Sequence, residues 1–389
     1  MTKFRPFLVS GVFLLTLAVS DALFPAQLDD LFDASVPVAG KESGNREGGL
    51  RDALLAVLVK LTGRRDIAED PAAANLLGRG RSFLQRYTYE ERENPPDPED
   101  IFAQPVKEVL LHAWFDAVAL QRAVRVAGLP LWGRERPTTL VWLAFETDGN
   151  RVLFSSHTAG NLDLLTKDDV FENPVTIIQQ SIEEASSRRG IPWQFPFLDD
   201  EEKAVIGFTD VWGGFSERIL AASERYATYG ILAGNIFYAG EDRWSARWVL
   251  YTEHSETQWQ VLAESLTAAI DAGIDGTADI YGEKFAVDTA IAGHARFAME
   301  IGGVATLDDY ARVLDYLENL SMVQGVFVNR VLDGSLFVDI TVLGDAVALE
   351  QAMAIGDTLA TVDTIELVID LDDPDSVQQD SVLKYRLQH

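Results

Sequence analysis

Residues 132–137 carry side chains that bind ligands in many proteins. Trp132, Arg134 and Arg136 follow one another between two prolines, directly before the run TTLVWLAF. Guanidinium groups bind carboxylates and phosphates, so Arg134 and Arg136 are candidates for contact with an anionic ligand. The alternative is structural, because a proline biases the residue before it toward extended backbone and the following run has the β-branched and aromatic content of a buried strand. We favour this second interpretation, a rigid entry to a strand.

A second candidate is the run of carboxylates Asp199, Asp200, Glu201 and Glu202, which follows a short predicted strand. Carboxylate oxygens are ligands for Ca²⁺ and Mg²⁺, and strand ends often carry ligand groups in α/β sheets. Such a run is also typical of a solvated loop that opens a helix. We favour the loop and keep Asp199 and Asp200 as weak binding candidates.

Trp212 is the third candidate, since it precedes two glycines that would let a helix N-terminus approach an anion. The acidity of the chain opposes anion binding and favours a tight turn. Trp212 could also form a surface that stacks on sugars together with Trp193, Trp244, Trp248 and Trp259, but the strand spacing of these residues favours packing within the core and on the sheet faces.

Motifs that specify a reaction are missing from the sequence. It contains no phosphate-binding loop, dinucleotide fingerprint, nucleophile elbow or zinc-protease helix motif. The histidines are far apart and show no paired metal spacing; they are His112, His157, His254, His294 and His389. A serine hydrolase would need one of them beside a serine and a carboxylate, and nothing singles out such a trio. We therefore assign no catalytic residue, no metal ligand and no cofactor.

Charge and cysteine content narrow the classes of partner. The chain of 389 residues has 32 Lys and Arg against 61 Asp and Glu, a formal net charge of −29. Such a field repels nucleic-acid phosphates and anionic lipid headgroups, so we predict no nucleic-acid partner. A salty or alkaline habitat would explain the same acidity. The absence of cysteine excludes disulfides, thiol nucleophiles and thiolate zinc sites.

The N-terminus predicts export. Lys3 and Arg5 precede an uncharged, largely apolar stretch from Phe7 to Ser20, with small residues offering cleavage sites, so residues 1–22 are predicted to be a signal peptide. An uncleaved anchor is the alternative. No later stretch approaches the length of about 18 apolar residues that a spanning helix needs. We expect a periplasmic or otherwise exported protein with no integral membrane domain beyond such an anchor.

The order of predicted elements indicates a multi-domain protein of the α+β and α/β classes. A small α+β domain is predicted over 28–130, a central α/β domain with a mixed sheet flanked by helices over 131–290, and a ferredoxin-like βαββα unit over 295–371. The last stretch, 372–389, is an acidic tail ending in the possible strand SVLKYRLQ. A helix is predicted to end at Gly63, and another helix is predicted to begin after the N-cap Thr306.

The sequence also resembles a known family. The stretches LVKLTGRRD, LPLWGRERPTTLVWLA, ERYATYGILAGNI, WSARWVL and LKYRL are similar to those of the domain of unknown function numbered 2066, whose members carry signal peptides in Gram-negative bacteria. The resemblance implies compartment and architecture only. The middle segment also looks like the α/β fold of the TolB N-terminal domain and of curli-secretion lipoproteins, in order of elements alone.

These expectations favour a non-catalytic exported envelope protein that acts through contacts with a protein or another envelope component. Two alternatives stay open. The first is a hydrolytic or metal-dependent enzyme that uses the region of residues 199–202 or the loop 132–136. The second is a periplasmic carrier that holds a small ligand in a pocket between domains.

Overall fold

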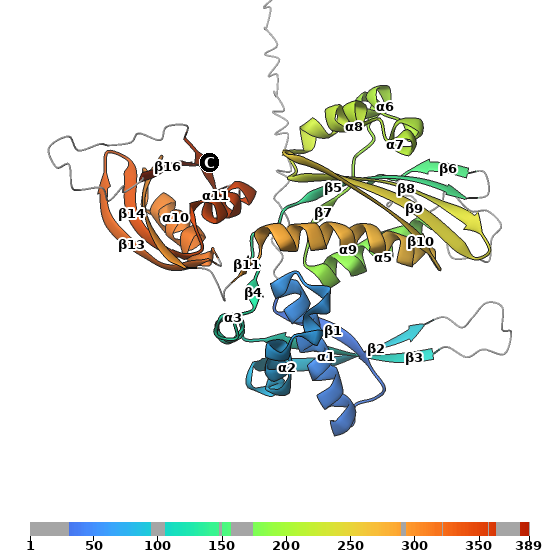
Figure 1. The fold of residues 1–389 in the computed structure, drawn as a ribbon, viewed down its shortest axis with the longest axis horizontal. Helices are drawn as coiled ribbons and strands as arrows, with labels where there is room; N and C mark the ends of the chain where they lie inside the picture. The colour runs from blue at the N-terminus through green and yellow to red at the C-terminus, as the bar shows by residue number, and fades with distance from the viewer. Residues whose placement is uncertain are drawn as a thin grey trace, which may run out of the picture.

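The computed structural model describes residues 31–94, 106–147, 150–156, 174–288, 293–320, 322–356, 358–362 and 382–388. Over these residues the fold is a mixed α+β architecture in which three parts each have their own sheet and core (Figure 1). This confirms the predicted fold class. The predicted signal peptide and the acidic stretch 372–380 lie outside the described residues.

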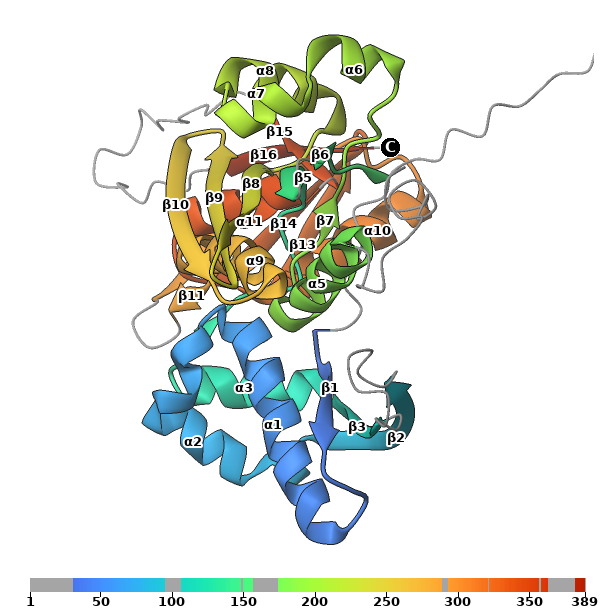
Figure 2. The ribbon, with the colours of Figure 1, turned by 90° about the vertical axis from the view of Figure 1, so that its right-hand side faces the viewer.

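The N-terminal part packs helices on one face of a three-stranded antiparallel sheet (Figure 2). Its elements are β1 (Asp33–Val38), α1 (Ser43–Thr62), η1 (Arg65–Glu69), α2 (Pro71–Gly78), η2 (Gly80–Ser82), β2 (Leu84–Asn94), β3 (Val106–Phe115) and α3 (Ala117–Val126). The strand order is β1-β3-β2. Leu54 and Leu58 of α1 are fully buried, and Leu111 of β3 belongs to the same core. The alternation of β3 therefore leaves His112 on the opposite face of the sheet.

The central part is built on a larger mixed sheet. Its elements are β4 (Pro130–Leu131), β5 (Thr139–Thr147), β6 (Asn150–Leu153), α5 (Pro174–Arg189), β7 (Trp193–Gln194), α6 (Asp200–Val205), α7 (Phe208–Gly213), α8 (Ser216–Ser223), η4 (Glu224–Tyr226), β8 (Gly230–Gly240), β9 (Arg243–Thr252), β10 (Ser255–Ala263), α9 (Leu266–Phe285) and β11 (Val287–Asp288). The main strand order is β10-β9-β8-β5-β6, and β7 pairs β5. Among the described strands of this sheet, the pairs that β5 makes with β7 and β8 are parallel and the others are antiparallel.

Helices cover both faces of the central sheet (Figure 1). Alternate residues of β5 serve two cores: Leu143 packs with the side of α5 and α9, while Trp142 packs with the side of α7 and α8. Both side chains are fully buried, which explains why this strand has no polar face in the sequence. β8, β9 and β10 form an antiparallel meander, in which β8 turns into β9 at residues 240–242.

The C-terminal part is a five-stranded sheet with two helices on one face. Its elements are β12 (His294–Gly302), α10 (Leu307–Asn319), β13 (Val323–Leu332), β14 (Ser335–Leu343), α11 (Ala346–Ile355), β15 (Leu359–Thr361) and β16 (Val382–Leu387). The strand order is β13-β14-β12-β16-β15, and β16 runs parallel to β12. Thr306 caps α10 by accepting the Asp309 N–H at 3.1 Å, as predicted from the sequence.

Two short strands connect the parts. β4 and β11 form a two-residue antiparallel pair, in which Leu131 faces Val287 and Pro130 faces Asp288. The chain therefore leaves the N-terminal part and enters the C-terminal part at the same place. Beside this pair, the end of α1 meets α5 and α9 of the central part.

Candidate functional site

The segment 132–137 lies against the C-terminal end of α1. Trp132 is 1% exposed, and its backbone N–H donates to the Leu61 carbonyl oxygen at 2.6 Å. The last carbonyl groups of a helix have no partner within the helix, so this contact satisfies one of them. The structure thus places Trp132 in a contact between parts of the chain.

Arg136 is buried at the same helix end. Its Nε donates to the Gly133 carbonyl at 2.7 Å, and its Nη2 donates to the carbonyls of Lys60 at 2.8 Å and Trp132 at 3.1 Å. Its guanidinium carbon lies 3.8 Å from the centre of a Trp132 ring. Burial lowers the pKa of Arg136 to about 9, so the group is still charged at neutral pH. A buried positive charge at this position complements the negative end of the α1 dipole.

The other candidate arginine of the segment has a different environment. Arg134 is exposed, and its guanidinium carbon lies 5.8 Å from the ring centre of Phe32. The two arginines, two residues apart, therefore offer a matched pair: one is part of the interior and the other faces solvent.

Two glycines bring α1 and α9 into backbone contact. Gly63, the C-cap of α1, has φ = 71°, a conformation that side chains other than glycine rarely adopt. A Cβ atom on Gly63 would lie 2.7 Å from the Gly282 Cα atom, and one on Gly282 would lie 2.9 Å from the Gly63 Cα atom. Neither residue can carry a side chain without moving one helix away from the other.

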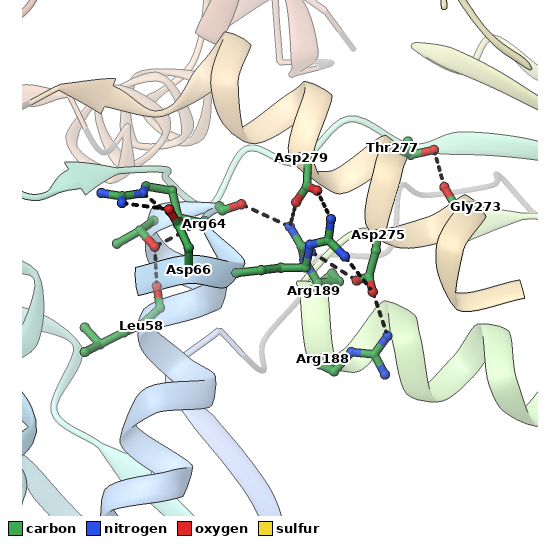
Figure 3. A network of polar contacts seen from close by, with 12 residues as sticks. Leu58, Arg64, Asp66, Arg188, Arg189, Gly273, Asp275, Thr277 and Asp279 are labelled. Atoms are coloured by element: carbon green, nitrogen blue, oxygen red, sulfur yellow. Dashed lines mark hydrogen bonds and ion pairs between the residues drawn. The ribbon is translucent and has the colours of Figure 1, made fainter. Parts of the chain in front are cut away.

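Arg189 joins both helices at this contact (Figure 3). Its Nη2 donates to the Gly63 carbonyl at 3.0 Å and to Asp279 Oδ1 at 2.7 Å, and its Nη1 donates to Asp275 Oδ1 at 3.0 Å. The side chain is 1% exposed, against 15% for Asp275 and 37% for Asp279. The end of α1, Arg136, Arg189 and these two aspartates of α9 are called the joint below. Sequence inspection did not single out Arg189, Asp275 or Asp279.

Exposed arginines extend the network on both sides. Arg65 donates to Asp279 Oδ2 at 2.5 Å and lies 3.6 Å from Asp275 Oδ2. Arg188 reaches Asp271 at 3.3 Å and Asp275 at 3.4 Å. Burial raises the pKa of Asp271, although Arg188 acts in the opposite direction. The carboxylates of α9 therefore lie between arginines that come from η1 and from α5.

A hollow of about 660 Å³ lies beside the joint, where the carrier alternative would place a ligand. It is lined by Thr62, Gly63, Arg64, Arg65, Asp66, Pro130, Asp279, Gly282, Glu283, Ala286 and Asp288. Its guanidinium groups are already bound within the chain: Arg64 binds Asp66 at 3.0 Å, and Arg65 binds Asp279. Its wall offers more carboxylates than cations, so it does not favour an anionic ligand.

The carboxylates of residues 199–202 lie in a separate lobe formed by α6 to α8. Asp199 is the N-cap of α6: its Oδ1 accepts the Glu202 N–H at 2.9 Å, and its Oδ2 accepts from Arg225 at 2.8 Å. The Glu202 N–H and, after it, Arg225 hold the pKa of Asp199 below its usual value. Asp200 is an exposed residue in the first turn of the same helix.

Glu202 is the member of this run that is buried. It is 3% exposed and accepts a hydrogen bond from the Leu198 N–H at 2.6 Å and another from the Tyr226 hydroxyl. Burial, followed by the Glu202 carboxylate, raises the pKa of Tyr226. Two of the four carboxylates therefore bind groups of their own lobe.

Trp212 lies in α7 against the central sheet. Its ring is 5.2 Å from that of Phe208 and 5.9 Å from that of Phe237. Its carbonyl oxygen accepts from Asn235 Nδ2 and from Arg247 Nη2, both at 2.8 Å. The indole is part of an aromatic cluster between α7 and β8.

The structure also forms a trio that the sequence did not reveal. Ser35 Oγ lies 2.9 Å from His112 Nδ1, and His112 Nε2 lies 2.9 Å from Asp33 Oδ2. Trp114 stacks on the imidazole with ring centres 4.1 Å apart, and Arg86 lies 4.0 Å above Trp114. A serine, a histidine and a carboxylate in this order are the elements of a hydrolase triad. Predicting this trio from the sequence would have required knowing that Ser35 of β1 pairs with His112 of β3.

The trio lies on one face of the three-stranded sheet. β3 is the middle strand of this sheet, so its backbone N–H groups are used by the ladders to β1 and β2. These N–H groups of β3 are thus not free to stabilise an oxyanion beside Ser35. Ser35 is exposed and His112 is 32% exposed on the face of the sheet opposite to α1. The hydrogen bonds of His112 fasten β1 to β3.

Within the described parts of the chain, no group of three or more His, Asp or Glu residues is arranged to hold a metal ion. None of the helices described has both the length and the apolar character that crossing a membrane requires.

Comparison with known proteins corrects the predicted resemblance. Residues 26–133 match the model of a family described as Domain of unknown function (DUF8605), which differs from the family numbered 2066. The match covers the N-terminal part together with Trp132 and Gly133. Nothing supports the likeness of the middle segment to TolB or to curli-secretion lipoproteins. No curated protein matches the chain.

Proposed function

We propose that the protein is a non-catalytic, exported component of the cell envelope that acts by contact with another protein or envelope component. The observation that carries this proposal is the use of the gathered polar side chains. Arg136 and Arg189 bind carbonyls and carboxylates of the joint, and Glu202 binds a hydroxyl and an N–H of its own lobe. Most polar atoms of these groups are used in holding the chain together; Arg136 Nη1 and Arg189 Nε have no hydrogen-bond partner among the described residues.

The compartment follows from the N-terminal sequence. Lys3 and Arg5 before an apolar stretch are the features of a secretory signal. A chain without cysteine forms no disulfides, so its composition is compatible with an oxidising as well as a reducing compartment. Cell fractionation of the full-length chain tests this: we expect the protein in the envelope fraction. Recovery in the cytosol would overturn the proposed compartment.

Cross-linking from defined positions tests the proposed mode of action. Because the chain has no cysteine, single cysteines at exposed sites such as Val126, which is 84% exposed, carry a photo-cross-linker at one known position. We expect some positions to yield the same discrete adduct in intact envelopes and others to yield none. Adducts from no position would contradict the proposal.

A serine hydrolase is the second candidate, and the trio of Asp33, Ser35 and His112 is the observation that favours it. In such an enzyme His112 would accept the Ser35 proton while Asp33 orients the imidazole. A fluorophosphonate probe followed by mass spectrometry tests this role, with Ser35→Ala as the control. Labelling of Ser35, lost in Ser35→Ala and in His112→Ala, would replace our proposal by the hydrolase. We expect no labelling of Ser35 above that of other exposed serines.

A further inference from the structure

The sheet of the C-terminal part has one face that no described helix covers. α10 and α11 pack on the other face, through residues such as Val313 and Leu349. A hollow lined by residues of α9, β11 and α11 lies between this helix side and the central part. Figure 1 shows α11 toward α9, with β13 and β14 on the far side. The uncovered face therefore points away from the rest of the molecule.

This face gathers the cations of the C-terminal part. The described Lys and Arg residues of this part are Arg296, Arg312, Arg330, Lys384 and Arg386. All except Arg312 lie on strands. Arg296, Lys384 and Arg386 alternate with buried residues, and Arg330 pairs with Phe337 after a β-bulge, so all four lie on the uncovered face. We call this the cationic face. Among the described strand residues, Glu300 and Asp339 contribute carboxylates to it, whereas α10, α11 and their N-caps carry six, Asp308, Asp309, Asp315, Glu318, Asp345 and Glu350.

The cationic face is also hollowed and partly aromatic. A hollow of about 470 Å³ is lined by residues that include Glu300, Arg330, Phe337 and Lys384. The Arg330 guanidinium carbon lies 4.4 Å from the ring centre of Phe337. Phe327, on the edge strand β13, is 69% exposed. The face thus offers apolar contact beside positive charge.

Two arginines of this face form no ion pair within the described part of the chain. They are Arg296 and Arg386, and both are exposed. Lys384 lies 4.0 Å from Glu300. Because these cations gather on one face of a chain whose net charge is −29, they create a local site for an anionic group.

We infer that the cationic face binds an acidic segment of a partner protein that also carries aromatic or apolar side chains. Carboxylates of the segment would bind Arg296, Arg330 and Arg386, and its apolar side chains would pack on Phe327 and Phe337. This inference rests on the proposed function, since it names the class of partner. Nucleic acid and anionic membrane are disfavoured because such extended polyanions would also meet the remaining acidic surface.

A titration with defined probes tests the inference. A fluorescein-labelled synthetic peptide of alternating Asp and Phe is titrated with the full chain, and binding is followed by fluorescence anisotropy. The test variant carries Arg296→Glu, Arg330→Glu and Arg386→Glu. The control variant carries Arg51→Glu, Arg122→Glu and Arg243→Glu, which are exposed arginines elsewhere on the molecule. Both variants have the same net charge, so any difference between them reports position.

We expect the test variant to bind the peptide about tenfold more weakly than the control variant, with unchanged melting temperatures. Equal binding by the two variants would overturn the inference. Tighter binding of vesicles rich in anionic lipid, or of single-stranded DNA, than of the peptide would overturn it as well. If envelope cross-links persist but arise from other faces, the inference fails while the proposed function stands. If no position yields an envelope cross-link, the proposed function itself fails.

Discussion

The arginines of the joint and those of the cationic face belong to opposite environments. Arg136 and Arg189 are almost completely buried, and their N–H groups donate to carbonyl and carboxylate oxygens of two parts of the chain. Arg296 and Arg386 are exposed on an outward face and form no ion pair within the described residues. The residue type alone therefore does not separate a structural arginine from one that is available to a partner.

The burial of an arginine determines how much its replacement lowers the free energy of unfolding. Removing a buried guanidinium leaves the buried groups that it binds without partners. An exposed guanidinium loses little when it is replaced, because water solvates it. We therefore expect changes at the joint to lower stability, and changes on the cationic face to lower binding.

The largest effect is expected for Arg189→Met. Methionine fills much of the volume, but Asp275, Asp279 and the Gly63 carbonyl lose their shared partner, so we expect the free energy of unfolding to fall by about 3–5 kcal/mol. The neighbouring Arg188→Met is the control, because that side chain is 44% exposed and its loss should cost about 1 kcal/mol or less. Urea unfolding of both variants measures the difference. If Arg189→Met and Arg188→Met were equally stable, burial would not determine the contribution of these arginines to stability.

A second, smaller effect is expected within residues 132–137. Arg136→Ala leaves the carbonyls of Lys60 and Gly133 without their donor, so it should lower the free energy of unfolding by about 2–3 kcal/mol. Arg134→Ala should change it by about 0.5 kcal/mol or less, because that side chain is exposed. Thermal unfolding of the pair checks this. A ligand-binding activity lost in Arg134→Ala at an unchanged melting temperature would show that the segment contacts a ligand.

The trio should contribute less than the joint. Ser35→Ala removes one hydrogen bond to His112 on an exposed face, and we expect a loss of about 1 kcal/mol, measured by urea unfolding at neutral pH. Thr88→Ala on β2, at the position paired with His112, is the control for an exposed strand residue. A Ser35→Ala variant that is as stable as the wild type would show that the trio does not fasten β1 to β3.

The smallest effect is expected for the contribution of Asp199 to stability at low pH. Its pKa is lower in the folded chain than its ordinary value, so its contribution to stability is present at neutral pH and is lost as the pH falls below that ordinary value and through the folded pKa. Asp199→Asn keeps an acceptor for the Glu202 N–H but has no charge for Arg225. The stability difference between the wild type and this variant should therefore shrink in acid, as urea unfolding at several pH values measures. A difference that does not vary with pH would contradict the assigned cause.

Local features were predictable from the sequence, whereas contacts between distant residues were not. Gly63 and Thr306 follow helix-end rules that act within a few residues, and both ends lie where these rules place them. Arg189 meets Asp275 across 86 positions, and Ser35 meets His112 across 77, so no spacing rule connects them. The predicted family was wrong, since residues 26–133 match a different family and stretches of so few residues do not specify one family.

The contacts of the joint predict that the N-terminal and central parts unfold as one cooperative unit, and unfolding of an Ala74→Cys variant followed by two probes tests this most directly. Tryptophan emission reports mainly on the central part, since seven of the eight tryptophans lie between residues 132 and 259. A dye on Ala74→Cys in α2 reports on the N-terminal part, because the chain has no other cysteine. We predict that both signals change at the same urea concentration. Loss of the dye signal while tryptophan emission stays native would contradict the claim.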